Sequence, residues 1–139
     1  MRLQSKNESE TINLGQRLGQ KLKPGDVVCL YGELGAGKTT ITKGIASSFG
    51  IKERDITSAS YTIIAEYDGD IPFYHIDLYR IMNGDTLDLG LDEYFHSDGV
   101  SVIEWAERAA NEIPDNCIKV RMNHAGDDLR EIELEGLEL

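Results

Sequence analysis

The chain has 139 residues, 40% of them hydrophobic and 28% charged, and its 25 acidic and 14 basic side chains give a formal net charge of −11. These values are typical of a globular protein, so we expect one domain spanning residues 1–139. The acidic excess disfavours direct, tight binding to nucleic acids. The lack of a run near the ~18 apolar residues of a membrane span, or of a signal-peptide core, predicts a cytoplasmic protein that does not act at a membrane.

The first predicted element is an amphipathic helix over residues 7–22. Leucines recur at every fourth position from Leu14 to Leu22, which places them on one face of a helix. Asn7 and Glu10 have the spacing of a capping box, in which each side chain accepts a hydrogen bond from a backbone N–H at the helix start. We therefore expect a helix that packs its leucine face on the core.

Residues 32–40, GELGAGKTT, fit the phosphate-binding pattern G-x-x-x-x-G-K-[ST]. Before them, residues 26–31 form an apolar, β-branched run that is typical of a buried strand. After them, apolar residues recur at every fourth position from Ile41 to Phe49, and Gly50 ends the pattern as a helix C-cap would. Strand, glycine loop and helix are the arrangement in which a P-loop binds a nucleotide.

Each residue type in this loop has a chemical reason. Glycines allow positive φ, so the backbone can wrap closely around phosphate oxygens and present its N–H groups to them. Lys38 is expected to reach the β- and γ-phosphates, and the Thr39 hydroxyl to hold Mg²⁺. The candidate nucleotide-binding residues of the loop are Gly32, Glu33, Leu34, Gly35, Ala36, Gly37, Lys38, Thr39 and Thr40.

Residues 58–67 and 71–77 are predicted to form a β-hairpin, because both runs are rich in β-branched and aromatic residues and an Asp-Gly turn separates them. Pro72 belongs at an edge or at the start of its strand. Asp77 ends the second strand, where a Walker B aspartate would bind Mg²⁺ directly or through water. The alternative for Asp77 is a turn-capping role.

Residues 86–95 have helical spacing of apolar side chains, and residues 100–103 form another buried strand. This strand places Glu104 and Trp105 at its carboxyl end, where ligands collect in open α/β sheets. Glu104 is a candidate for orienting the attacking water or for joining the metal shell. Trp105 is either a partly buried core aromatic residue or a contact for the nucleotide or a partner.

The remaining residues complete an α/β pattern. A short helix is predicted over residues 106–113, followed by strands over 117–122 and 129–134. Cys29 and Cys117 lie in apolar runs and are expected to be buried small residues. The predicted fold is a single P-loop NTPase-like α/β domain with a mixed central β-sheet flanked by helices.

With these motifs together, the chain resembles the TsaE family, also called the YjeE family, of bacterial tRNA threonylcarbamoyladenosine biosynthesis ATPases. The P-loop alone is generic, whereas its combination with the later motifs is specific. The resemblance extends over almost the whole chain and is carried by residues 32–40, 57–62 (TSASYT), 74–80 (YHIDLYR), 89–95 (LGLDEYF) and 102–105 (VIEW).

The resemblance implies an ATP hydrolase that binds ATP and Mg²⁺, releases ADP and works with the TsaB–TsaD heterodimer. Together these proteins install threonylcarbamoyl on adenosine 37 of tRNAs reading ANN codons. The ATPase drives the TsaB–TsaD complex through its cycle without transferring the threonylcarbamoyl group, has low activity without its partners, and meets tRNA only through the complex.

By position, the resemblance assigns catalytic roles to Lys38, Asp77 and Glu104, and metal-binding roles to Thr39, Asp77 and Glu104. It also assigns Trp105 to the nucleotide site. Ser60 occupies a switch-like threonine position. The family usually reads S-P-T-[FY] there, whereas this chain has Ala59 in place of the proline and a serine in place of the threonine. Serine keeps the hydroxyl, while the loss of proline removes a restraint on φ.

Three other functions share the P-loop. A GTPase normally carries N-K-x-D and D-x-x-G motifs, and the sequence contains neither. A nucleoside or small-molecule kinase needs an acceptor site and usually an arginine-bearing lid, for which the basic residues here offer no cluster. The third is a regulatory module that binds ATP with little hydrolysis. The sequence does not separate such a module from an enzyme, whereas the rate of ATP hydrolysis with and without partners does.

Overall fold

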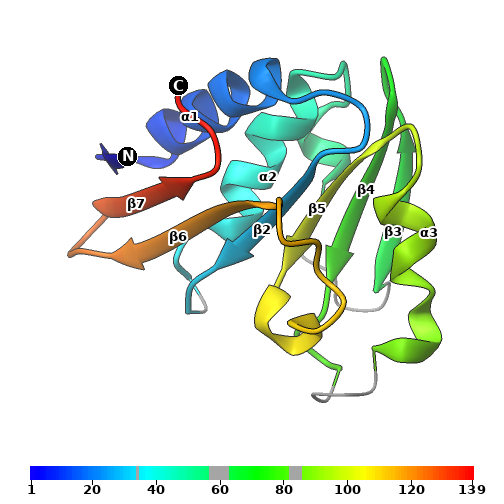
Figure 1. The fold of residues 1–139 in the computed structure, drawn as a ribbon. Coiled ribbons are helices and arrows are strands. Elements are labelled where there is room, and N and C mark those ends of the chain that lie inside the picture. Colours follow the sequence, from blue (N-terminus) through cyan, green and yellow to red (C-terminus); the bar gives the residue numbers. More distant parts are fainter. Residues whose placement is uncertain (34, 57–62, 82–85) are drawn as a thin grey trace.

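The structure is a computed structural model that describes residues 1–33, 35–56, 63–81 and 86–139. Its strands form one sheet in the order β1-β7-β6-β2-β5-β4-β3 (Figure 1). The strands are β1 (Arg2–Ser5), β2 (Val27–Tyr31), β3 (Ile64–Asp68), β4 (Pro72–Asp77), β5 (Val100–Glu104), β6 (Ile118–His124) and β7 (Arg130–Glu135). The central strands β6, β2, β5 and β4 are parallel, whereas β1, β7 and β3 pair antiparallel. The predicted mixed sheet is confirmed.

Helices cover the two faces of the sheet unequally. The long helices α1 (Glu8–Lys21) and α2 (Lys38–Ser47) lie together on one face, and the short helix α3 (Leu91–Phe95) lies on the other (Figure 1). Short 3₁₀ helices complete the fold at Glu53–Asp55, Leu87–Leu89 and Ala106–Ala109. The arrangement leaves the outer strands β1, β7 and β6 covered by long helices on one side only.

Strand β2 shows how the sheet divides the core. Val28 and Leu30 pack with the α1–α2 cluster, while Val27 and Cys29 pack with the cluster on the opposite face, as the alternation of a strand requires. Cys29 and Cys117 are both buried free thiols, as expected. Burial raises the pKa of the Cys29 thiol well above its ordinary value, and the neighbouring Cys117 adds to this effect.

The two long helices approach each other through glycine. A Cβ added to Gly44 would overlap the carbonyl oxygen of Ile12 and lie 3.0 Å from the Cα of Gly15. Because the glycines at this crossing have no side chains, α2 packs very closely against α1. This contact also positions the P-loop, which precedes α2.

A Gly44→Ala variant should separate these helices and destabilise the protein. We expect the free energy of unfolding to fall by about 1–3 kcal/mol, the usual cost of overpacking a core, although alanine is a better helix former than glycine by roughly 1 kcal/mol. Urea denaturation measures the change. Lys43→Ala on the same helix is the matched control, with an expected change within about 0.5 kcal/mol; equal stability of Gly44→Ala and the parent would contradict the close crossing.

The predicted N-terminal helix is confirmed, and its cap differs in one detail. The Asn7 side chain accepts a hydrogen bond from the Glu10 backbone N–H at 2.9 Å, as in a capping box. The Glu10 carboxylate instead accepts from the N–H of Lys6 at 3.0 Å. Strand β1, which precedes this cap, was not predicted. Its four residues pair with β7, so β1 and not β7 is the edge of the sheet.

Two predicted helices are shorter than expected. The helix over residues 86–95 is divided at Gly90, whose φ of +69° ends the 3₁₀ helix Leu87–Leu89 before α3 begins. The helix over residues 106–113 is limited to the 3₁₀ helix Ala106–Ala109 and is followed by turns. Segments this short form too few backbone hydrogen bonds to sustain an α-helix without extensive packing.

The predicted hairpin is present as β3 and β4, with Pro72 at the first position of its strand. Strand β3 begins at Ile64, later than the expected start at residue 58. Residues 57–62, which include Ala59 and Ser60, lie outside the described residues. The hairpin brings Asp77 to the carboxyl end of β4, beside β5.

Candidate nucleotide-binding site

The loop between β2 and α2 has the backbone that the P-loop pattern predicts. Gly32, Gly35 and Gly37 have φ values of +151°, +80° and +100°, which disfavour residues with a Cβ. A Cβ at Gly32 would also lie 2.5 Å from the carbonyl oxygen of Met122. Gly37 is the N-cap of α2, so the loop leads directly into the positive end of a helix dipole. Leu34 lies outside the described residues.

The side chain of Lys38 folds back over this loop. Its ammonium donates hydrogen bonds to the carbonyl oxygens of Gly32 and, at 3.4 Å, Glu33, and it lies 4.0 Å from the ring centroid of Trp105. Burial lowers the pKa of Lys38, while the carboxylates of Glu104, Glu107 and Asp77 oppose this effect. A compact cation is thus held at the loop with acidic groups around it.

Thr39 and Glu104 contact each other directly across the sheet end. The Thr39 Oγ1 donates to both carboxylate oxygens of Glu104, at 3.2 Å to Oε1 and 3.3 Å to Oε2. Glu104 is the last residue of β5 and pairs in register with Leu30 of β2, so the strand order places it next to the P-loop. The side chain is 3% exposed. The sequence predicted that both residues serve one site, and the fold brings them together.

Asp77 ends β4 directly opposite Glu104 in the parallel register. Its Oδ1 accepts a hydrogen bond from the backbone N–H of Tyr79 at 2.9 Å, so it does cap the following turn. This cap does not preclude a second role, because a carboxylate has two oxygens and about four acceptor positions. Asp77 also influences Lys38 electrostatically, which places it within the same charged group.

The donor set of this group suits Mg²⁺. One hydroxyl from Thr39 and the carboxylates of Glu104 and Asp77 are hard oxygen ligands of the kind that Mg²⁺ binds, and Mg²⁺ in nucleotide sites uses only one or two protein carboxylates beside phosphate and water. Within the described ranges no group of three or more His, Cys, Asp and Glu side chains is arranged to hold a metal by itself. One hydroxyl and two carboxylates are a donor set that fits Mg²⁺ together with phosphate oxygens.

Trp105 follows Glu104 in a left-handed backbone conformation, with φ of +59°, which is unusual for a bulky residue. Its half-buried ring contacts Lys38 on the P-loop, Tyr79 with ring centroids 5.1 Å apart, and the Arg108 guanidinium at 5.5 Å. The sequence left two roles open for Trp105, a core aromatic residue or a contact for the nucleotide or a partner. The contact with Lys38 connects its ring to the P-loop.

A small cavity of about 110 Å³ lies beside the start of α2. It is polar and lies between the first turns of α1 and α2 and the β6–β7 side of the sheet. Its lining residues are Asn7, Glu8, Thr11, Gly37, Thr40, Asp128 and Arg130. Two members of the predicted loop, Gly37 and Thr40, line this cavity.

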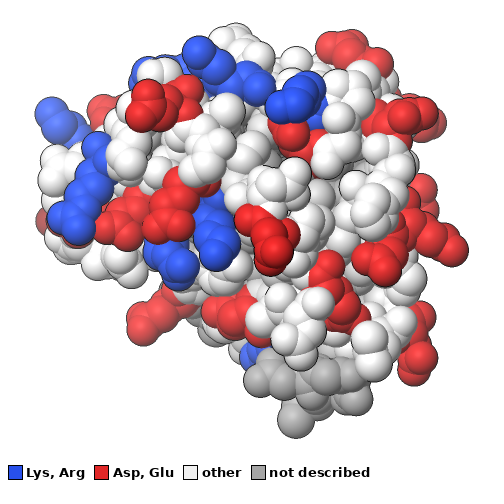
Figure 2. All heavy atoms as spheres, in the orientation of Figure 1, with Lys and Arg blue, Asp and Glu red and all other residues white. Residues whose placement is uncertain are grey.

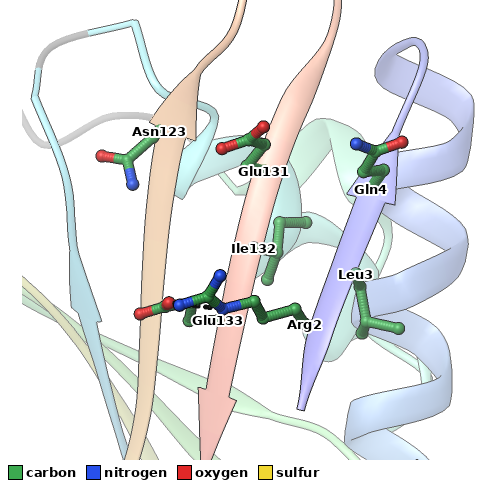
Figure 3. A pocket seen from close by; sticks show the side chains of 7 residues that line it. All are labelled: Arg2, Leu3, Gln4, Asn123, Glu131, Ile132 and Glu133. Carbon is green, nitrogen blue, oxygen red and sulfur yellow. Dashed lines mark ion pairs between the residues drawn. The ribbon is translucent and has the colours of Figure 1, made fainter.

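A second hollow, of about 760 Å³, lies on the flank formed by β1, β7 and β6 (Figure 3). Arg2 reaches across β7 to form an ion pair with Glu133 at 3.0 Å, and Gln4 and Glu131 stand beside it. Both members of the ion pair are solvent-exposed, so its net contribution to stability is small. None of the predicted site residues lines this hollow.

A family model described as "Threonylcarbamoyl adenosine biosynthesis protein TsaE" matches residues 5–132. The chain belongs to the TsaE family. The Bacillus subtilis protein named tRNA threonylcarbamoyladenosine biosynthesis protein TsaE is 48% identical over 127 residues, covering 91% of this chain and 79% of its own. The protein of the same name from Treponema pallidum is 41% identical over 133 residues, covering 95% and 98%.

A solved structure agrees with this assignment. The crystal structure of Bacillus subtilis YdiB superimposes with a TM-score of 0.79 at 43% identity, covering 95% of this chain and 82% of that one. The chain is therefore an α/β protein of P-loop NTPase-like fold, as predicted, from a family of tRNA threonylcarbamoyladenosine biosynthesis. No helix in the described part of this TsaE family member is long and apolar enough to cross a membrane.

Sequence reasoning gave no role to His75, which belongs to the motif Y-H-I-D-L-Y-R. The His75 Nε2 lies 2.5 Å from the Glu104 Oε2, and both side chains are buried. One feature of the sequence could have assigned His75 to the site. It lies two residues before Asp77, and residues two apart on a strand share a face. It predicts that His75 and Asp77 point to the same side of β4.

Proposed function

We propose that this chain is the ATP-hydrolysing subunit of the tRNA threonylcarbamoyladenosine machinery. It binds ATP with Mg²⁺, hydrolyses ATP to ADP and phosphate, and so drives a TsaB–TsaD complex through its cycle for modification of adenosine 37 in tRNAs reading ANN codons. It does not transfer the threonylcarbamoyl group, and its hydrolysis is slow without these partners. Membership of the TsaE family supports the pathway, and the P-loop supports the nucleotide.

One observation carries the proposal: Thr39 of the P-loop is hydrogen-bonded to the buried Glu104, with Lys38 beside them. Phosphoryl transfer needs a cation at the transferring group, an oriented water and little covalent chemistry from the protein. Lys38 supplies the cation. Glu104, at the carboxyl end of β5, would accept a hydrogen bond from the attacking water and so orient it toward the γ-phosphate.

The bound Mg²⁺ would neutralise charge that develops on the phosphate oxygens. Thr39 would hold it through the hydroxyl, and Asp77 and Glu104 through carboxylates, directly or through water. The three side chains come from the ends of α2, β4 and β5, so the fold rather than one segment assembles this set. Ser60 remains a proposed switch residue from the resemblance alone.

The cavity beside α2 is our proposed site for the adenosine part of ATP. It adjoins Gly37 and Thr40 at the start of α2, so a nucleotide with its phosphates on the loop would place its adenosine there. Asn7, Thr11 and Arg130 offer polar groups to a base or ribose there. Helix capping by Asn7 uses its Oδ1, which leaves the side-chain amide N–H₂ as a donor.

Surface charge supports an indirect role toward tRNA. On the face in Figure 2, acidic side chains dominate the right-hand side, which carries β3, β4 and α3, while basic ones lie toward the left and top. With a formal net charge of −11, the protein would repel a phosphate backbone over much of this surface. We therefore propose that the TsaB–TsaD heterodimer holds the tRNA.

The test is hydrolysis of ATP and GTP by the pure protein, with and without TsaB–TsaD. We expect slow ATP hydrolysis alone, clear stimulation by the partners and a preference for ATP over GTP. Tight ATP binding with no hydrolysis in the assembled complex would replace the proposal with a regulatory binding module. Transfer of phosphate to a small acceptor, without stimulation by the partners, would replace it with a kinase.

A further inference from the structure

The Glu104 carboxylate has a second buried partner besides Thr39. The His75 Nε2 lies 2.5 Å from its Oε2, and the two residues are each 3% exposed. A carboxylate removed from water needs hydrogen-bond donors, because an unpaired buried charge is strongly unfavourable. An ionised carboxylate can only accept, so the imidazole presents Nε2–H to it.

The sheet determines this contact. His75 lies on β4 and pairs in register with Val102 of β5, two residues before the paired positions Asp77 and Glu104. The glutamate side chain therefore turns back along β5, toward the histidine, while Thr39 approaches it from the first turn of α2. Donors on two different elements hold the carboxylate.

We propose that His75 is a positioning residue for Glu104: its Nε2–H holds the Oε2 so that the carboxylate keeps the orientation in which it can align a water for ATP hydrolysis. This inference rests on the proposed hydrolysis. A glutamate side chain has three rotatable bonds and loses much of its rotamer freedom when it is fixed. A donor built into the neighbouring strand supplies that order before the nucleotide binds.

The hydrogen bonds to the two carboxylate oxygens of Glu104 explain why His75 would have this role. Oε2 accepts from both His75 and Thr39, whereas Oε1 accepts, among the residues that the structure describes, only from the Thr39 hydroxyl at 3.2 Å. If Thr39 turns its hydroxyl to a metal, as proposed above, the Thr39 bonds are lost and the His75 bond remains. The histidine is then the hydrogen-bond donor on the protein that keeps the carboxylate from rotating.

The experiment compares three replacements of His75 in the assembled complex with TsaB–TsaD. His75→Gln places an amide donor near the former Nε2 position, His75→Asn places one near Nδ1, and His75→Leu has none. We expect kcat for ATP hydrolysis to fall about 10- to 100-fold in His75→Leu, the range seen when partners that orient site residues are removed. His75→Asn should fall similarly, and His75→Gln should recover most of the rate.

Two readouts separate positioning from a structural role. The KM for ATP, and its Kd by calorimetry, should change little in all three variants, because His75 is buried against Glu104 and is not among the residues proposed to bind phosphate or base. Thermal unfolding identifies a variant that fails to fold; if His75→Leu does so, the comparison of His75→Gln with His75→Asn decides. Equal kcat in those two folded variants, or a change confined to KM, would overturn the proposal.

A third readout is independent of activity. Long-range ¹H–¹⁵N NMR of the three histidines should show one ring whose Nε2 carries a proton that exchanges slowly with water, and His75→Gln should remove that signal. A proton on Nδ1 instead would overturn the inference. If the wild-type protein does not hydrolyse ATP, the proposed function is wrong, and the role of His75 depends on that function. Failure of the proposed function can therefore be distinguished from failure of the His75 proposal alone.

Discussion

A Lys38→Ala variant is expected to lose productive ATP hydrolysis. The ammonium lies at the P-loop with the carboxylates of Glu104 and Asp77 near it, and in the proposed mechanism it faces the transferring phosphate. Removing one such preorganised donor lowers kcat by roughly 100- to 1,000-fold in other enzymes, and we expect at least that loss here. Phosphate release by the complex with TsaB–TsaD, measured at saturating ATP, gives the change.

Lys38 also contacts the loop carbonyls and the Trp105 ring, so its removal can loosen the loop as well as remove a charge. Thermal unfolding of the variant reports that effect separately. Lys43→Ala, on the same helix and away from these contacts, is the control for loss of a lysine and should keep the parent rate. Full activity in Lys38→Ala would reject the site assignment.

A Glu104→Gln variant is expected to bind ATP and fail to hydrolyse it. Glutamine keeps the shape and one acceptor oxygen, so the contacts with Thr39 and His75 can persist while the negative charge that orients and activates water is lost. Loss of a general base typically lowers kcat by about 100- to 10,000-fold. The Kd for ATP should change less than about 3-fold, because the lost interaction acts mainly in the transition state.

Single-turnover hydrolysis and calorimetry on the same preparation separate these two quantities. Glu135→Gln is a matched control, since Glu135 is exposed at the end of β7, on a strand that carries none of the proposed catalytic residues. A collapse of ATP affinity with turnover per bound nucleotide preserved would assign Glu104 to binding rather than to water. A magnesium titration of both variants shows how much of any affinity change comes from the metal.

The sequence predicted the local features of the fold well because they depend on local chemistry. The P-loop, its strand and its helix follow from glycines, an apolar run and a four-residue repeat, and all three lie where expected. The mixed sheet likewise follows from buried strands without alternation at its centre. The position of Glu104 at the carboxyl end of β5 was also predicted, and its role in the site stays a prediction.

What the sequence missed depends on contacts between distant residues. Strand β1 is only four residues long and has no β-branched residue, so only its pairing with β7 reveals it. His75 gains its importance from Glu104, 29 residues away along the chain. Gly90 divides a predicted helix because its backbone is left-handed, a feature that the spacing of apolar residues does not report.

The pairing of β1 with β7 has a consequence for synthesis of the protein on the ribosome. Ser5 pairs with Arg130, so β1 cannot pair until the ribosome has added 125 more residues. At a translation rate of ~5–20 residues per second, this delay is roughly 6–25 s. The nascent chain can assemble β2, α2 and β5 in that time, but this flank of the sheet closes only when the last strand emerges.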